Sequence, residues 1–356
     1  MCPVIAVKLS EFNYDLPPEL IAQEPLPSRA SSRLFVMDRK KGGFLHRAFA
    51  DLPSFLRKGD VLLINESRVI PARLRLVRGG SGGKVEVLLL RSRGLGDWEA
   101  QLKPSARMRP GQRLVRADSP EQVILTVAGQ TGEGRWTVRE GDGAGGNLLG
   151  LGEAPLPPYI KREPGGRQRA YDLERYQTVY ARVPGSVAAP TAGLHFTEEM
   201  LSAVRGAGAD IARFSLHVGM GTFSPVRAEA DISGHRMEPE RYEISPESVQ
   251  ALKGVRDRGG RMVAVGTTGV RVLETIGPAL DSLAGTGASG ETGLFITPGF
   301  EFRFTGAMLT NFHLPKSTPF ILLAALAGLE PVRKAYAEAV RERYRFLSYG
   351  DAMLVI

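Results

Sequence analysis

The feature that most constrains the fold is a change of pattern part-way along the chain. Residues 76–153 alternate short β-like runs with Gly, Asp and Ser, and no helical period separates the runs. From residue 154 onward, helix and strand signals alternate instead. Closely spaced short strands are typical of a small antiparallel barrel or sandwich, whereas helix–strand alternation is typical of an α/β domain with a largely parallel sheet. The chain therefore has to accommodate two architectures.

We predict that the β-rich stretch is inserted into the α/β part. Residues 1–75 mix strand and helix signals, with strands expected at 34–38 and 60–65 and a short helix at 49–56. The predicted fold is a barrel-like α/β domain of residues 1–75 and 154–356 that carries an inserted small antiparallel β-barrel domain of residues 76–153. Five strands are expected in the insertion, followed by a glycine-rich exit linker, at residues 84–90, 98–102, 112–116, 123–127, 135–139 and 141–152.

Capping residues mark the helices expected after the insertion. Ser and Thr before an early acid or a proline are typical helix starts. We expect helices to begin after Asp172 (running to residue 181), Thr197, Ser245 and Ser317, and one to cover residues 270–276. A further helix buries one face, formed by Val332, Ala335, Tyr336, Ala339, Val340 and Tyr344. The strands expected between these helices cover residues 211–217, 261–265 and 351–356.

Charge and cysteine content restrict the partners and the compartment. The chain has 46 Lys and Arg against 38 Asp and Glu, a net charge of +8, which favours polyanions such as RNA. Acidic membranes and a merely basic protein remain open alternatives. Cys2 is the single cysteine, which excludes an intrachain disulfide and a zinc ribbon. The N-terminus is unsuitable as a signal peptide, and the most apolar run, residues 320–329, is about half a membrane span. We expect a cytoplasmic protein without a membrane segment, and a monomer because no extended apolar stripe is left unassigned.

Five segments place functional side chains beside Gly, Pro or Thr at the edges of predicted elements. They are residues 189–197, 217–223, 235–240, 265–274 and 310–317. Loops at strand ends are where α/β proteins hold their functional groups. Each segment alone also fits a structural turn or, for 235–240, solvent-exposed charge.

Histidines and hydroxyls carry the chemistry of these segments. A histidine that recurs in such loops predicts a shared cleft, and four of the five histidines do so: His195, His217, His235 and His313. Thr267 and Thr268, bracketed by glycines ahead of Arg271, form a polar cradle at the start of a helix. This cradle is not a P-loop, because the required lysine is absent.

Basic residues cluster in three stretches. Backbone phosphates would bind such clusters, and solvated surface is the alternative for any one of them. The clusters are Lys103, Arg107, Arg109, Arg113 and Arg116; Lys161, Arg162, Arg167 and Arg169; and Arg341, Arg343 and Arg345.

Taken in order, the segments resemble the tRNA ribosyltransferase-isomerase family of queuosine synthesis. Many short matches in the same order, along almost the whole chain, are far more specific than any one of them. They cover residues 12–17, 21–25, 32–34, 63–73, 156–160, 174–181, 185–197, 217–223, 265–274, 310–317 and 348–353. The chain departs from the family pattern at Glu66, where the family usually has Asp, and at Glu238, where it tends to have a second His. The insertion matches poorly apart from residues 103–105.

This resemblance implies an unusual use of S-adenosylmethionine. Its ribosyl group, not its methyl group, is transferred to the aminomethyl group of a 7-deazaguanine base (preQ1) at the anticodon wobble position of tRNA. Adenine and methionine leave, and an epoxycyclopentane forms, which gives epoxyqueuosine. The implied partners are this tRNA and S-adenosylmethionine as co-substrate, and no bound cofactor or metal is expected.

Roles follow from this chemistry, since protons must leave the attacking amine and the carbon beside the sulfonium, and adenine must gain one. Histidine transfers protons near neutral pH, so the acid–base candidates are His195, His217 and His313. Glu240, or Glu238, would stabilise the sulfonium or act as a base. Thr267, Thr268 and Arg271 would bind the ribose and the methionine carboxylate, Arg271 by a two-pronged contact. The other substrate-binding candidates are Thr191 and Asn311, with Asn65 and Arg68 for the modified base, and the tRNA-binding candidates are Lys103, Arg107, Arg109 and Arg162.

Three rival functions remain open at this point. A metal-dependent hydrolase would use the histidines with Glu238, although no local pair such as His-x-x-x-His is present. A non-catalytic RNA-binding protein fits the charge and the β-domain, but the aromatic signature of an RNA-recognition module is missing. An ordinary methyltransferase is disfavoured, because no strand leads into Gly-x-Gly-x-x-Gly at the start of a helix.

Overall fold

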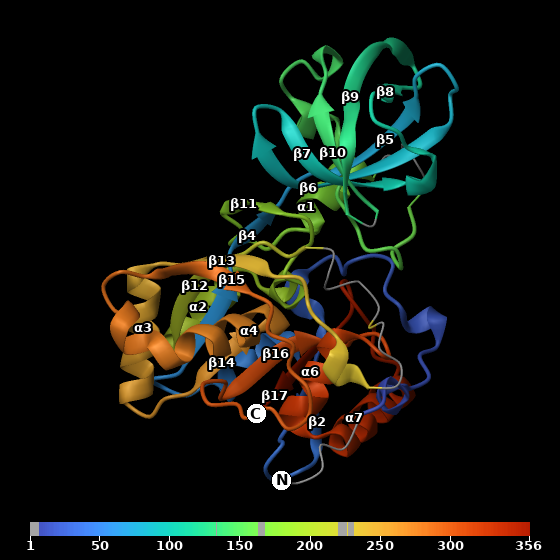
Figure 1. The fold of residues 1–356 in the computed structure, drawn as a ribbon. Helices are drawn as coiled ribbons and strands as arrows, with labels where there is room; N and C mark the ends of the chain where they lie inside the picture. Colours follow the sequence, from blue (N-terminus) through green and yellow to red (C-terminus); the bar gives the residue numbers. More distant parts are fainter. Residues whose placement is uncertain (1–6, 133, 163–167, 220–225, 227–230) are drawn as a thin grey trace.

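Figure 1 shows a closed β-barrel joined to a larger α/β part. The structure is a computed structural model, and it describes residues 7–132, 134–162, 168–219, 226 and 231–356. An α/β part and an inserted β-barrel are therefore present in the predicted order along the chain, but the sheet of the α/β part is open rather than barrel-like.

The α/β part is built on one mixed sheet. In the described part of the chain, nine strands pair in the order β15-β13-β12-β3-β14-β16-β17-β1-β2, with β15 and β2 at the two ends. The four central strands β12, β3, β14 and β16 run parallel, as do β17 and β1. The strands are β1 (Arg33–Met37), β2 (Phe44–Ala48), β3 (Val61–Asn65), β12 (Asp210–Leu216), β13 (Glu240–Ile244), β14 (Met262–Val265), β15 (Ala288–Thr292), β16 (Ala307–Asn311) and β17 (Ala352–Val355).

Helices cover both faces of this sheet. In β1, Leu34 and Val36 join one apolar cluster, while Phe35 and Met37 join another, so the strand is buried on both sides. Such double burial explains why the strand is a continuous apolar run rather than an alternating one. The helices of the described residues are α1 (Arg169–Arg175), α2 (Glu198–Gly206), α3 (Pro246–Asp257), α4 (Gly266–Ile276), α5 (Leu280–Leu283), α6 (Thr318–Ala327) and α7 (Leu329–Arg341).

The insertion is a closed antiparallel barrel. Its strands pair in the order β10-β7-β6-β5-β8-β9, and the interior is filled by aliphatic side chains and Trp136. The strands are β5 (Arg73–Arg78), β6 (Lys84–Gly94), β7 (Asp97–Lys103), β8 (Arg113–Arg116), β9 (Ser119–Gly132) and β10 (Arg135–Glu140). The barrel alternative, rather than the sandwich, is confirmed.

The chain enters and leaves the barrel at one place. The backbone of Arg73 exchanges two hydrogen bonds with that of Glu153, at 3.2 and 2.7 Å. A two-stranded parallel sheet of β4 (Ser67–Val69) and β11 (Val183–Ser186) lies between the barrel and the large sheet in Figure 1. The domain boundaries at residues 76 and 153 stay predictions, and the hydrogen-bonded crossing at 73 and 153 lies close to them.

Three local expectations were wrong in detail. The sheet is mixed rather than largely parallel, since two helices, α6 and α7, separate β16 from β17 and return the chain antiparallel. Asp172 does not cap a helix running to residue 181; it lies inside the shorter helix α1, where its buried carboxylate accepts hydrogen bonds from Arg162. The helix expected at 270–276 starts earlier, at Gly266, whose φ of 81° lets β14 turn directly into α4.

Three predicted caps are confirmed. The side chains of Thr197, Ser245 and Ser317 accept hydrogen bonds from the backbone N–H groups of the first turns of α2, α3 and α6. Within the described ranges, no helix is long and apolar enough to cross a membrane.

Candidate active site

The carboxyl ends of four parallel strands meet at one edge of the large sheet. Asn65 ends β3, Asn311 ends β16, Gly266 follows β14 and His217 follows β12. Functional groups of open α/β sheets lie outside this edge. The segments singled out in the sequence therefore converge on one region of the fold.

A cavity of about 400 Å³ opens at this edge. Its volume suits a small-molecule substrate. Its surface is mainly apolar, and ten of the 23 residues that line it carry polar groups: Tyr159, Thr191, Thr267, Thr268, Thr310, Asn311, His313, Lys316, Ser317 and Ser348. Of the four loop histidines, His313 alone lines it, so the predicted gathering of four histidines in one cleft was wrong.

The start of helix α4 forms one wall of the cavity. Gly266, Thr267 and Thr268 line the cavity, and no described side chain caps the free N–H groups of this helix end. Thr268 is 7% exposed, and its hydroxyl has no hydrogen-bond partner among the residues that the structure describes. Uncapped backbone N–H groups and a free hydroxyl together can hold an anionic or polar ligand group.

His313 follows β16 and also lines the cavity. Its Nε2 is 2.8 Å from the Thr310 hydroxyl, and its backbone N–H donates to the Tyr336 hydroxyl at 3.1 Å. Burial lowers the pKa of His313 to about 3. The ring is thus neutral at pH 7, and it can take up a proton only when a substrate changes its surroundings.

His195 lies behind the cavity wall rather than in it. It ends the 3₁₀ turn η8 (Thr191–His195), is 4% exposed and packs against Phe49, with the rings tilted by 31° and their centres 5.1 Å apart. Nδ1 is 2.8 Å from the Ser32 hydroxyl, and Nε2 is 3.1 Å from the amide nitrogen of Asn311. Burial, with Arg29 and Arg345 nearby, lowers its pKa to about 3.

His217 and His235 have separate surroundings. His217 packs on Gly185, where an added Cβ would lie 2.9 Å from the ring, and burial lowers its pKa although Glu243 opposes the shift. His235 packs edge-on against Phe295, and burial lowers its pKa too. Residues 220–223, the rest of the glycine motif after His217, lie outside the described residues.

The ligand candidates of the rival metal-dependent hydrolase do not gather among the described residues. In the part of the chain that the structure describes, no three His, Cys, Asp or Glu side chains lie close enough together to hold a metal ion. Glu238 is exposed and forms an ion pair with Arg135 of the barrel. Glu240 is buried against Arg271 instead.

Arg271 of helix α4 forms a buried ion pair with Glu240 of β13. Both side chains are 4% exposed, and Glu240 also accepts a hydrogen bond from the Gly219 N–H at 3.1 Å. The other guanidinium nitrogens of Arg271 donate to the carbonyls of Leu294, at 3.0 Å, and Thr292, at 2.8 Å. In this arrangement the guanidinium is engaged by protein acceptors, and it braces α4 against β13 and β15.

Asn65 and Arg68 do not line the cavity. Asn65 is fully buried, and its amide ties the end of β3 to Leu216 and Ser67 through three hydrogen bonds of 3.0 Å. Arg68 lies on β4 with an exposed side chain. Their predicted contact with the modified base stays a prediction.

The tRNA-binding candidates differ in their partners. Lys103, Arg107 and Arg109 are exposed on the barrel and form no ion pair with any residue the structure describes. Arg162 is instead paired with Asp172 at 2.9 Å and with Glu24 at 3.3 Å. Arg167, in the same stretch, lies outside the described ranges.

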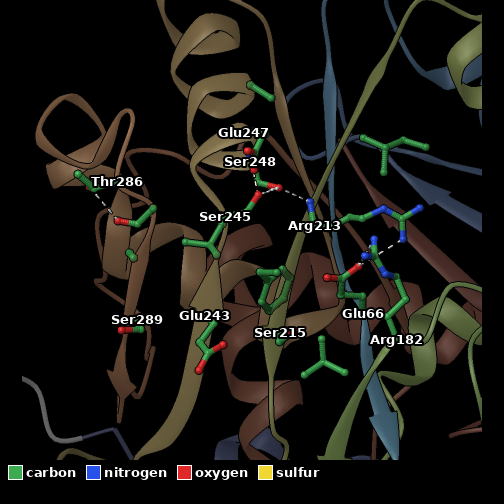
Figure 2. Close-up of a pocket in the computed structure, with 17 residues that line it drawn as sticks. Glu66, Arg182, Arg213, Ser215, Glu243, Ser245, Glu247, Ser248, Thr286 and Ser289 are labelled. Carbon is green, nitrogen blue, oxygen red and sulfur yellow. Dashed lines mark hydrogen bonds and ion pairs between the residues drawn. The ribbon is translucent and has the colours of Figure 1, made fainter.

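A larger hollow, of about 870 Å³, borders β12 and the start of α3 (Figure 2). Figure 2 shows Arg182 and Arg213 directed at Glu66, which lies 3.7 and 3.5 Å from them and balances part of their charge. None of the predicted catalytic or substrate-binding residues, all of which the structure describes, lines this hollow. The smaller cavity is therefore the better candidate active site.

Three polar residues at the site had no role predicted from the sequence. Tyr159 and Ser348 line the cavity and share a hydrogen bond of 2.7 Å, and Ser32 contacts His195. All three lie in segments that carry the family resemblance. Their place in these segments could have marked the three residues as candidates, but it does not indicate which residue each one contacts.

Comparison with known proteins decides the family. The family model described as "Queuosine biosynthesis protein" matches residues 9–355. The chain belongs to this family.

Relatives in the queuosine biosynthesis family are similar over their full length. The chain is 49% identical to the S-adenosylmethionine:tRNA ribosyltransferase-isomerase of Symbiobacterium thermophilum, covering 98% of this chain and 100% of the relative. It is 50% identical to the protein of that name in Rubrobacter xylanophilus, over 98% of each chain. A crystal structure of S-adenosylmethionine tRNA ribosyltransferase from Thermotoga maritima is 35% identical, covers 97% of this chain and 100% of its own, and has a TM-score of 0.54.

Proposed function

We propose that this protein transfers and isomerises the ribosyl group of S-adenosylmethionine onto the preQ1 base of tRNA, giving epoxyqueuosine-tRNA with adenine and methionine. The observation that carries the proposal is the family match over residues 9–355. Relatives named S-adenosylmethionine:tRNA ribosyltransferase-isomerase, at 49–50% identity, support it. The cavity at the carboxyl edge of the sheet is large enough for a nucleoside substrate and lies where such sites are expected.

We place the methionine part of S-adenosylmethionine at the start of helix α4. Its carboxylate needs N–H and O–H donors, and this helix end, which no described side chain caps, offers both together with Thr267 and Thr268. Because Arg271 is engaged with Glu240 and two carbonyls, its predicted two-pronged contact with the carboxylate would require those contacts to open. Bracing of α4 is the simpler role for this pair.

His313 is our first choice for the proton-accepting group. It lines the cavity, and its neutral ring can accept a proton from the substrate amine or from the carbon beside the sulfonium. Glu240, His195 and His217 do not line the cavity and are weaker candidates for direct proton transfer. Thr191 lines the cavity, which supports its proposed contact with the substrate.

We assign tRNA contact to the exposed barrel cations Lys103, Arg107 and Arg109. A cation without a carboxylate partner loses no ion pair when it binds a phosphate. Arg162 already pairs with two carboxylates and would have to lose those contacts, so it is the weakest of the four candidates. We further propose a cytoplasmic monomer that uses S-adenosylmethionine as co-substrate and no bound cofactor.

A product assay tests the reaction. Purified protein, S-adenosylmethionine and preQ1-containing tRNA should release free adenine and methionine, and the same tRNA carrying guanine at the wobble position should give neither. Appearance of S-adenosylhomocysteine would show methyl transfer instead. Salt-sensitive tRNA binding without turnover would favour a binding protein.

A further inference from the structure

A chain of hydrogen bonds runs from a buried serine to the cavity wall. Ser32, just before β1, is 3% exposed and contacts His195 Nδ1 at 2.8 Å. His195 Nε2 is 3.1 Å from Asn311 Nδ2, and Asn311, 2% exposed, lines the cavity at the end of β16. The three residues come from three separate segments, and nothing in the reaction proposed above uses Ser32.

The carbonyl of Leu347 fixes the direction of every bond in this chain. It lies 3.2 Å from Asn311 Nδ2, and a carbonyl can only accept, so the amide nitrogen must face it. The second hydrogen on Nδ2 then donates to His195 Nε2, which places the imidazole proton on Nδ1. Nδ1 donates to the Ser32 hydroxyl, and that hydroxyl donates to the carbonyl of Arg29 at 3.4 Å.

This arrangement consumes both amide hydrogens of Asn311 and leaves its oxygen. Oδ1 is buried and has no partner among the residues that the structure describes. A buried acceptor without a donor is unfavourable, and a ligand that supplies a donor removes the penalty. Rotation of the amide would bring Oδ1 against the Leu347 carbonyl, so the oxygen of this cavity-lining residue is held in one orientation as an acceptor.

We propose that His195 is a positioning residue: together with Ser32 it fixes Asn311 so that Oδ1 accepts a hydrogen bond from an N–H group of the substrate. This inference rests on the proposed function, whose two substrates both carry such groups: the adenine amino group and the methionine ammonium group of S-adenosylmethionine, and the aminomethyl, N1–H and 2-amino groups of the tRNA base. Protonation of His195 would place an N–H at Nε2 against the Asn311 N–H and break the chain. The surroundings of His195, which hold the ring neutral, fit this role.

Two substitutions of similar polarity separate positioning from proton transfer. In His195→Gln, the side-chain oxygen falls near the position of Nε2 and can still accept from Asn311. In His195→Asn, the shorter side chain reaches only the position of Nδ1, and the acceptor is removed. We expect H195N to lose on the order of 10²-fold in kcat/KM, since small misplacements at a site cost about this much, and H195Q to stay within about tenfold of the parent.

Asn311→Ala supplies the partner test. It should lose as much activity as H195N, and the double variant H195N/N311A should lose little more, because both changes remove the same interaction. The pH profile of H195Q should match the parent, since no proton passes through residue 195. Thermal melting of each variant verifies folding before kinetics are compared.

Binding measured separately for each substrate identifies the donor. Weaker binding of S-adenosylmethionine alone to N311A would assign Oδ1 to an N–H group of S-adenosylmethionine, and weaker binding of preQ1-tRNA alone would assign it to an N–H group of the preQ1 base. Parent-like kinetics and binding in N311A would overturn the proposal, as would an H195Q variant as inactive as H195N with a missing limb in its pH profile. Failure of the parent protein to release adenine would refute the proposed function instead, while the N311A binding comparison would still test the hydrogen-bond chain.

Discussion

Substitution of Glu240 by Gln tests whether the buried pair behind helix α4 is structural. The change keeps the shape of the side chain and an oxygen for the Gly219 N–H, but it removes the negative charge facing Arg271. Both side chains are 4% exposed, so water cannot replace the missing carboxylate. Among the described residues, the guanidinium would be left as a buried charge with two carbonyls and one amide oxygen as acceptors.

The size of the effect follows from this burial. Breaking a buried ion pair by removing one partner costs about 3–5 kcal/mol, and the retained amide oxygen favours the lower end, about 3 kcal/mol. A cooperative unit of roughly 280 residues unfolds with an entropy of about 0.6 kcal/mol/K. The melting temperature of the α/β part should therefore fall by about 5 °C.

Calorimetry or far-UV circular dichroism during heating measures this shift. The double variant Glu240→Leu with Arg271→Met is the matched control, since it removes both charges and leaves apolar groups of similar size. It should be more stable than either single substitution, because neither charge is left unpaired. Replacement of the exposed Arg303, which pairs with Glu301 on the surface, should change the melting temperature little.

A loss of less than about 1 kcal/mol in Glu240→Gln would refute this reasoning. In that case Arg271 would not depend on Glu240 in the folded protein, and it would be available to the substrate. The kinetic signature of that alternative is a raised KM for S-adenosylmethionine in Arg271→Met without a matching loss of stability.

Three further predictions concern other parts of the site. The triple change of Lys103, Arg107 and Arg109 to Gln should weaken tRNA binding and reduce the slope of log K against log salt by about 0.7–0.9 for each phosphate that is no longer neutralised, with unchanged binding of S-adenosylmethionine as the control. Thr268→Val should leave the melting temperature equal or higher, because the hydroxyl it removes is buried without a partner among the described residues. The same change should raise KM for S-adenosylmethionine. A stability loss above about 1 kcal/mol would show that the hydroxyl has a partner in the folded protein. His313 has a pKa of about 3 when folded and about 6.5 when unfolded, so the unfolded chain binds one more proton between these two pH values. His313 therefore lowers the stability progressively as pH falls from about 6.5 towards 3. Between about pH 7 and 5 the melting temperature of the parent should fall more than that of His313→Gln, and parallel curves would contradict this.

Local signals predicted the frame of the fold. The caps at Thr197, Ser245 and Ser317 could be predicted from the sequence because their partners lie three residues away. The carboxyl edge of the sheet could be predicted as the site because parallel strands bring the residues that follow them together.

Interactions between distant segments could not be predicted in this way. Ser32 and His195 are 163 residues apart, and they meet because η8 packs against the 3₁₀ turn Arg29–Ser31 that precedes Ser32. The same applies to Glu240 and Arg271, whose residue types suit a substrate site as well as a buried pair. Burial and partner, which decide between these roles, are properties of the folded chain rather than of a motif.

The hydrogen-bonded crossing at Arg73 and Glu153 affects how the chain folds. Strand β3 must find β12, about 150 residues further along, before the central sheet can form. If the barrel closes first, it brings residues 73 and 153 together, and its own residues no longer count towards the length of the loop between β3 and β12. With loop-closure entropy growing as the logarithm of length, this shortcut lowers the entropic cost by roughly 0.7 kcal/mol, or about threefold in the closure equilibrium. A folded insertion thus shortens the effective loop between the two halves of the α/β part before they pair.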